Sequence, residues 1–264
     1  FLYIVKIFIN FSDVKSDFFH PVKSNFFPWI WKIFLIFSIW FLSIDTSLLV
    51  SKYLWIIWVA IQFSFTVILF RRWILHEIDI NSLNPLWFLP VVWNLLAPIT
   101  WVRLWFIELS WFLFSLGFIM WIVLLVVFIN RVIFHNPMPD KLMPTLFILV
   151  APWSVCALSY IALNWWVLSD LSKITFYFSV FIFIMIISKI NILSKLKFYM
   201  SWWAYSFPMA VLTTSTLVMY HLTSNYFLWV LWVVFYIILI FIILLLLYYT
   251  YIGFRKKELC IEEK

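Results

Sequence analysis

The stretch Trp202-Trp203-Ala204-Tyr205-Ser206-Phe207-Pro208-Met209-Ala210 opens an apolar run, 202–221, that carries a proline inside it. Proline has no backbone N–H and frees a carbonyl one turn earlier, so Pro208 predicts a helix that is disrupted near residue 204. Hydrocarbon cannot satisfy a freed carbonyl, which is tolerated mainly against other protein or a wet cavity. The run therefore predicts a membrane helix that faces something polar.

Proline recurs in every second apolar run. The runs 28–44, 85–102, 144–163 and 202–221 contain, in order, Pro28; Pro85, Pro90 and Pro98; Pro144 and Pro152; and Pro208. The runs without proline are 53–70, 104–130, 174–188 and 226–253. Helix ends account for Pro28, Pro85 and Pro144, whereas the other four prolines lie inside apolar runs. The alternation predicts an inner ring of kinked helices around a polar path and an outer ring of straight helices facing lipid.

Composition places the chain in a membrane. Hydrophobic residues make up 67% of it and charged residues 11%, whereas soluble domains have roughly 45–50% and about 25%. Most of the runs reach the roughly 17–25 residues of a spanning helix. We predict an all-α integral membrane protein with one transmembrane domain over 1–264, built from these eight runs and a tail at 254–264. Residues 1–9 resemble the last turns of a further span, which predicts that upstream sequence is missing.

Basic residues are distributed unevenly among the predicted loops. If the loop 10–27 is cytoplasmic, all but three of the 18 lysines and arginines lie on that side. The exceptions are Lys52, Arg103 and Lys173, a bias that the positive-inside rule predicts. We expect a multi-pass protein of the inner or plasma membrane with a cytoplasmic C-terminus. The net charge of +7 then reflects topology and gives no indication of nucleic-acid binding.

Ionisable residues are nearly absent from the predicted spans. Arg103 and Glu108 flank the start of one run, and no paired carboxylates or His–Asp relay occur within the runs. This argues against a proton-driven pump with its own relay. Cys156 and Cys260 lie in an apolar run and in the tail, so they predict neither a disulfide nor a metal site. We expect no metal and no cofactor.

One spacing resembles an enzyme motif. His135 and Asp140 are separated by four residues, as in membrane-bound glycerolipid acyltransferases. Those enzymes need a sizeable catalytic domain that this chain lacks, and Pro137 and Pro139 favour an extended connector. We predict that the protein is not an enzyme.

Phe207 stands beside Pro208, and hydroxyl side chains follow at 213–216. A bulky ring at a break in a polar-lined helix suits a gate that closes a pore by excluding water. The alternative is a core phenylalanine packed between helices. The predicted site consists of the gate, Phe207, and the pore-lining or kink-forming residues Pro90, Pro98, Pro152, Ser206, Pro208 and Thr213.

The chain resembles a family that contains bacterial tellurite-resistance membrane proteins, fungal malic acid transporters and plant guard-cell slow anion channels. Three stretches carry the resemblance: Asp17-Phe18-Phe19-His20-Pro21 with Asn25-Phe26-Phe27; Leu142-Met143-Pro144-Thr145-Leu146 through Ala151-Pro152; and Trp202 through Pro208. They occur in the family's order and at similar spacing. Taken together they are specific, although no single one is.

The resemblance implies ten helices in five hairpins, with odd-numbered helices around a central pore, cytoplasmic termini and commonly a trimer. Residues 1–9 would then end the second helix, and the proline-bearing runs would be helices three, five, seven and nine. A phenylalanine in the ninth helix closes the family's pore, and Phe207 matches its position. The chain departs from the pattern in lacking the first helix and in having Trp153 and Cys156 where small residues are expected.

The resemblance implies an anion channel or channel-like anion transporter. Expected partners are the lipid bilayer, further copies of the chain in a homotrimer, and permeant small anions such as chloride, nitrate or malate-like species. The alternatives are a secondary carrier for C4-dicarboxylates or for oxyanions such as tellurite, a membrane subunit without transport activity, and a membrane acyltransferase.

Overall fold

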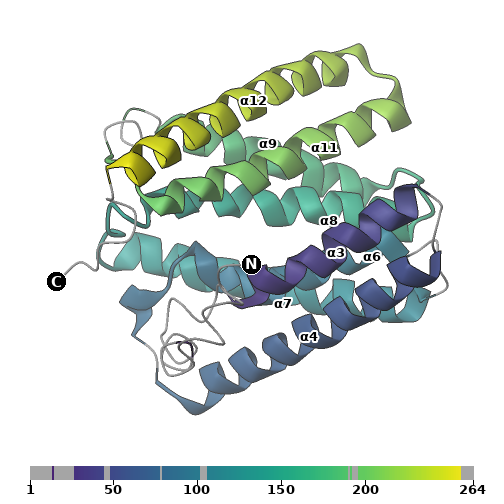
Figure 1. The fold of residues 1–264 in the computed structure, drawn as a ribbon, viewed down its shortest axis with the longest axis horizontal. Helices are drawn as coiled ribbons and strands as arrows, with labels where there is room; N and C mark the ends of the chain where they lie inside the picture. Colours follow the sequence, from purple (N-terminus) through teal and green to yellow (C-terminus); the bar gives the residue numbers. More distant parts are fainter. Residues whose placement is uncertain are drawn as a thin grey trace. The chain divides into compact units, whose positions relative to one another are not determined.

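The computed structural model of the chain describes Val14 and residues 27–44, 48–77, 79–101, 106–189, 191 and 196–256. The regular structure of these residues is helical, without strands, which confirms the predicted all-α class (Figure 1). They form two compact units, Phe1–Asn136 and Pro137–Lys264. The single transmembrane domain over 1–264 stays a prediction. The predicted remnant at 1–9 and residues 257–264 of the predicted tail lie outside the described residues.

The first unit begins with a helical hairpin. Helices α3 (Phe27–Ser43) and α4 (Leu48–Leu75) pack along each other (Figure 1). The buried Ser38 and Ser51 join them, because each hydroxyl donates to the other residue's backbone carbonyl, at 2.9 and 2.8 Å. Polar groups satisfied in this way cost little inside an apolar contact. The two serines therefore fix how the helices of the hairpin are aligned.

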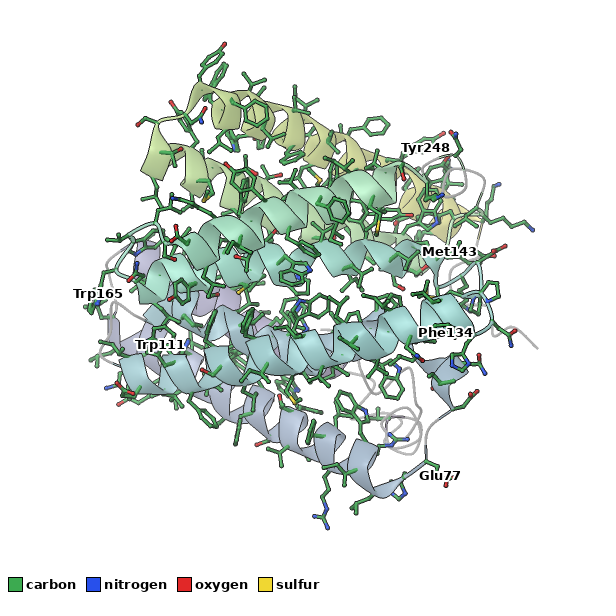
Figure 2. The ribbon with its side chains drawn as sticks, turned by 180° about the vertical axis from the view of Figure 1, so that it is seen from behind. Glu77, Trp111, Phe134, Met143, Trp165 and Tyr248 are labelled. Atoms are coloured by element: carbon green, nitrogen blue, oxygen red, sulfur yellow. The ribbon has the colours of Figure 1, made fainter. Side chains whose placement is uncertain are left out.

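A broken helical segment follows the hairpin. It consists of η2 (Ile80–Ser82), η3 (Pro85–Phe88), α5 (Leu89–Val92), η4 (Trp93–Leu96) and α6 (Ala97–Trp101), where η denotes a 3₁₀-helix. The Asn84 side chain caps η3 by accepting from the Leu86 backbone N–H at 3.0 Å. Helix α7 (Ile107–Phe134) packs along this segment. In Figure 2, Glu77 and Phe134 lie at one end of this unit and Trp111 lies at the other.

A glycine allows α7 to approach the broken segment closely. A Cβ atom added to Gly117 would lie 2.9 Å from Leu95 Cγ and 3.0 Å from the Leu95 backbone nitrogen. Real Cβ atoms essentially never come so near to other heavy atoms. The absence of a side chain at Gly117 therefore sets the distance between α7 and the backbone of η4.

The second unit contains η6 (Met143–Leu149), α8 (Val150–Leu163), α9 (Asp170–Ile187), η7 (Met200–Tyr205), α11 (Ser206–Thr223) and α12 (Tyr226–Arg255). Helix α8 packs against both α9 and α11, and α12 packs along α11 (Figure 1). Their shared core is formed by Ala157, Ile161, Phe176, Met219 and Leu228. Figure 2 places Met143 and Tyr248 at one end of this unit and Trp165 at the other.

Among the described residues, five segments are long and apolar enough to cross a membrane, and two shorter apolar helices, Trp31–Leu42 and Pro85–Thr100, accompany them. The proline-bearing segment Met143–Leu163 is 83% buried over its apolar window. The four proline-free helices, α4, α7, α9 and α12, are only 11–39% buried. Helices that expose so much apolar surface suit contact with lipid, whereas Met143–Leu163 is enclosed by protein. Burial of these five segments follows the predicted division into inner and outer helices, whereas the proline-bearing helix α3 exposes large apolar side chains such as Ile36 and Trp40.

Candidate functional site

The predicted gate lies where a 3₁₀-helix becomes an α-helix. Element η7 ends at Tyr205, and α11 begins at Ser206, whose Oγ donates to the Trp203 carbonyl at 2.7 Å. Phe207 is half-buried and Pro208 is buried. Pro208 is thus the third residue of an α-helix, where a backbone N–H has no intrahelical acceptor to lose. The structure differs here from one continuous α-helix kinked by its proline.

The same change of helix type occurs at the three other predicted prolines, and Pro90 is the second residue of α5, directly after η3. Pro152 is the third residue of α8, directly after η6, and Pro98 is the second residue of α6, directly after η4. Both prolines are buried. Helix starts therefore account for all four prolines that the apolar runs alone place in helix interiors: Pro90, Pro98, Pro152 and Pro208. The sequence could not show this difference, because a run with 3₁₀ and α parts has the same hydrophobicity as one α-helix.

Pro152 and Pro208 lie in neighbouring segments of the second unit. Element η6 packs on η7, and α8 packs on α11. The rings of Phe147 in η6 and Tyr205 in η7 meet edge to face, with their centroids 5.3 Å apart. The structure therefore brings together two of the three segments that carry the family resemblance. The third, around Asp17 to Phe27, lies almost wholly outside the described residues.

Trp153 and Cys156, which stand where the family pattern has small residues, both lie in α8. The Trp153 ring packs against Phe178 of α9, with the centroids 4.5 Å apart. Cys156 is fully buried within α8 and is not part of a disulfide. These larger side chains are accommodated by packing inside the second unit.

The hydroxyl groups of α11 bond to their own helix. Thr213 Oγ1 donates to the Met209 carbonyl at 2.8 Å, and the residue is 4% exposed. Thr214, Ser215 and Thr216 likewise donate to carbonyls three or four residues earlier. Because these four protons are already used, none of the four hydroxyls offers a donor to a passing anion. A pathway along this helix would hold anions weakly.

Pro90 belongs to a buried polar cluster in the first unit. Its carbonyl accepts from Gln62 Nε2 at 2.6 Å and from Thr66 Oγ1 at 2.7 Å, both on α4. Asn94 Nδ2 donates to Thr66 Oγ1 and to the Val91 carbonyl, each at 2.9 Å. The three side chains are 1–4% exposed. A backbone carbonyl in the broken segment is thus satisfied by protein, in agreement with what prolines in apolar runs predict.

Sequence reasoning missed this cluster because it weighed ionisable residues and neglected neutral polar ones. Gln62 and Thr66 are four residues apart in an apolar run, and Asn94 stands between Pro90 and Pro98. Residues four apart lie on the same face of a helix. The spacing of Gln62 and Thr66 could therefore have predicted a polar contact with another helix, since polar side chains in membrane helices usually bond to a neighbouring helix.

Replacing Thr66 by valine should lower the stability of the protein. Valine keeps the shape but removes the acceptor of Asn94 and one donor to the Pro90 carbonyl, so about 1–3 kcal/mol should be lost. Thermal unfolding of the purified protein in detergent measures the effect. The control is Ser64→Ala on the same helix, because the exposed Ser64 hydroxyl donates only to the Ala60 carbonyl of its own helix at 2.7 Å. Equal melting temperatures for the two variants would contradict a structural role for the cluster.

Two basic residues that the topology assigns to the cytoplasmic side are buried in the first unit. Lys32 of α3 is 7% exposed, and its Nζ lies over the ring face of Trp93 in η4. Arg131 of α7 is 2% exposed and donates to the Asn81 carbonyl at 3.3 Å. Lys32 lies in the second turn of α3, where a desolvated cation–π contact contributes about 2 kcal/mol.

The remaining residues considered from the sequence lie at the periphery. His135 caps the end of α7, and both it and Asp140 are exposed. Glu108 is exposed in the first turn of α7, whereas Arg103 lies outside the described residues. Within the described ranges, no three His, Cys, Asp or Glu side chains gather where they could hold a metal ion.

The length and apolar surface of the helices define a multi-pass integral membrane protein. Residues 1–251 match the family model described as voltage-dependent anion channel. The chain therefore belongs to the voltage-dependent anion channel family, which confirms the resemblance drawn from the three sequence stretches.

Curated relatives include plant channels and archaeal transporters. The chain is 26% identical over 221 residues to the guard cell S-type anion channel SLAC1 of Arabidopsis thaliana, covering 82% of this chain and 40% of the relative. It is 28% identical to the S-type anion channel SLAH1 of the same plant, over 80% of this chain and 56% of the relative. An uncharacterized transporter of Methanocaldococcus jannaschii is 29% identical, over 76% and 65%. The chain thus spans less than two thirds of the length of these relatives.

Proposed function

We propose that the protein is an anion channel or channel-like anion transporter that passes small anions such as chloride, nitrate or malate-like species. The match of residues 1–251 to the voltage-dependent anion channel family carries this proposal. The buried, proline-bearing segment Met143–Leu163 and the lipid-suited proline-free helices support it. In this proposal the protein works as a homotrimer in the inner or plasma membrane, with its C-terminus in the cytoplasm.

Phe207 is proposed as the gate of the pore. Its ring stands at the start of α11, beside the buried Pro208 and within the η7–α11 junction. Ser206, Thr213 and the prolines at 90, 98, 152 and 208 are proposed to line the pore or shape its wall. The hydroxyls of α11 bond to their own helix, so anion selectivity should be loose and should follow the cost of dehydration.

Anion flux through the full-length protein in liposomes tests the proposal. We expect flux of chloride and nitrate that far exceeds that of protein-free vesicles and does not require a proton gradient. Single-channel recording should show unitary currents. Saturable malate flux coupled to protons would replace the channel with a carrier, and the absence of any anion flux from folded protein would overturn the proposed function.

A further inference from the structure

We propose that Trp203 is a positioning residue of the gate: its indole, bonded to Thr250 of α12, holds the η7–α11 junction where Phe207 closes the pore. This inference deepens the proposed function and rests on it. It gives α12, which the sequence analysis expected to face lipid in an outer ring, a second role in controlling the path of the anion.

The η7–α11 junction lacks a backbone bond that a continuous α-helix would have. Pro208 has no N–H, so it cannot donate to the Ala204 carbonyl four residues earlier. Element η7 is a 3₁₀-helix of six residues, whereas poorer hydrogen-bond geometry usually limits 3₁₀-helices to about three or four residues. The position of the junction therefore depends on contacts with neighbouring segments.

The C-terminal end of α12 supplies such a contact. Trp203 Nε1 donates to Thr250 Oγ1 at 3.0 Å, and this bond is partly buried. The adjacent residue of α12, Tyr249, stacks its ring on Phe198 with the centroids 5.4 Å apart, and it meets the Trp202 ring at 6.0 Å. The end of α12 therefore holds η7 by a directed hydrogen bond and by aromatic packing beside it.

Trp203 passes this constraint to the gate through its backbone. Its carbonyl accepts from both the backbone N–H and the Oγ of Ser206, the latter at 2.7 Å. Ser206 is the first residue of α11 and directly precedes Phe207. A displacement of the Trp203 indole is thus carried over a few bonds to the backbone that orients the Phe207 ring.

Further contacts keep η7 in place when the bond to α12 is removed. Ser201 Oγ donates to the Lys141 carbonyl at 2.5 Å, and the Tyr205 ring meets the Phe147 ring edge to face. Loss of the bond to α12 should therefore loosen the junction without unfolding the second unit. One hydrogen bond of this kind shifts an equilibrium between two conformations by about three- to tenfold.

Thr250→Val tests the proposal, because valine keeps the shape of the side chain and removes the acceptor. Chloride flux through the full-length protein in liposomes should rise about three- to tenfold, since the Phe207 ring leaves the closed position more often. Thr250→Ser keeps a hydroxyl and should preserve the flux of the unchanged protein. Tyr248→Phe is the matched control, because it removes a hydroxyl from an exposed side chain at the same end of α12, and its flux should not change.

The same substitution in a Phe207→Ala background separates a positioning role from a general structural one. Without the ring there is no gate to position, so Thr250→Val should add no further flux to Phe207→Ala. The proposal is overturned if the two substitutions multiply each other's effects. It is also overturned if Thr250→Val passes no more chloride than Tyr248→Phe.

Hydrogen exchange of the backbone amides at 200–207 provides a readout that does not depend on transport. In detergent, at the same number of degrees below each melting temperature, these amides should exchange about three- to tenfold faster in Thr250→Val than in Tyr248→Phe. Equal exchange would contradict the proposal, because the junction would then be held without Thr250. If the unchanged protein passes no anion, the proposed function fails, and the exchange rates still decide whether Trp203 and Thr250 hold the junction.

Discussion

Anion flux through the full-length protein should rise about tenfold or more when Phe207 is replaced by alanine. Phe207 is half-buried at the junction of η7 and α11, next to the buried Pro208. A ring that closes an apolar constriction excludes water and imposes a barrier on every ion. Removing about 1.4 kcal/mol of such a barrier raises a rate tenfold. Chloride and nitrate flux into liposomes measures the change.

Phe181→Ala is the matched control for this prediction. Phe181 lies on α9 and is 55% exposed, so the same truncation there removes an aromatic ring without opening a path. Its flux should equal that of the unchanged protein. A Phe207→Ala variant with flux equal to or below that of Phe181→Ala would remove the gate assignment and leave Phe207 as a packing residue.

Gly117→Val should cause the largest loss of stability. The Cβ of any residue at 117 meets the Leu95 backbone nitrogen at 3.0 Å, and valine adds two methyl groups to that contact. Valine has a higher helix propensity than glycine, but this offsets less than about 1 kcal/mol of the lost stability. Overpacking costs about 1–3 kcal/mol, and more when backbone must move. The net effect should be a clear loss of folded protein and a lower melting temperature.

Ser115→Val on the same helix controls for the added bulk and β-branching. Ser115 is exposed, so valine there meets no neighbouring backbone. Thermal unfolding in detergent should separate the two variants by several degrees, with Ser115→Val close to the unchanged protein. If Gly117→Val melts at the same temperature as Ser115→Val, α7 does not depend on close contact with η4.

The all-α class was predictable, because the length and hydrophobicity of a run are enough to indicate a membrane helix. The clearest example of a predicted membrane helix is the proline-free run 226–253, which lies within α12, Tyr226–Arg255. The type of helix within the proline-bearing runs was not predictable. A proline in the first turn of an α-helix and a proline in its middle have the same neighbours in sequence, and only the position of the preceding 3₁₀ stretch distinguishes them.

The site was predictable in part. Pro208 and the motif around it marked the η7–α11 junction, whereas the polar contacts of Pro90 depend on α4, which lies far from it in sequence. Lys32 was counted as a loop charge because it follows a predicted loop closely. Its burial depends on Trp93, about 60 residues away, and periodicity carries no information about contacts at that separation.

The 3₁₀ stretches η3 and η4 of the broken segment bear on the thickness of the bilayer that this segment can cross. As one α-helix, Pro85–Trp101 would extend about 25 Å, several ångströms short of a hydrocarbon layer of about 30 Å. The four-residue stretches η3 and η4 rise about 2.0 Å per residue instead of 1.5 Å, which lengthens the segment to about 30 Å. The segment can therefore match the hydrocarbon layer without thinning it. Rewinding both stretches into α-helix would draw one end of the segment inward by about 4 Å.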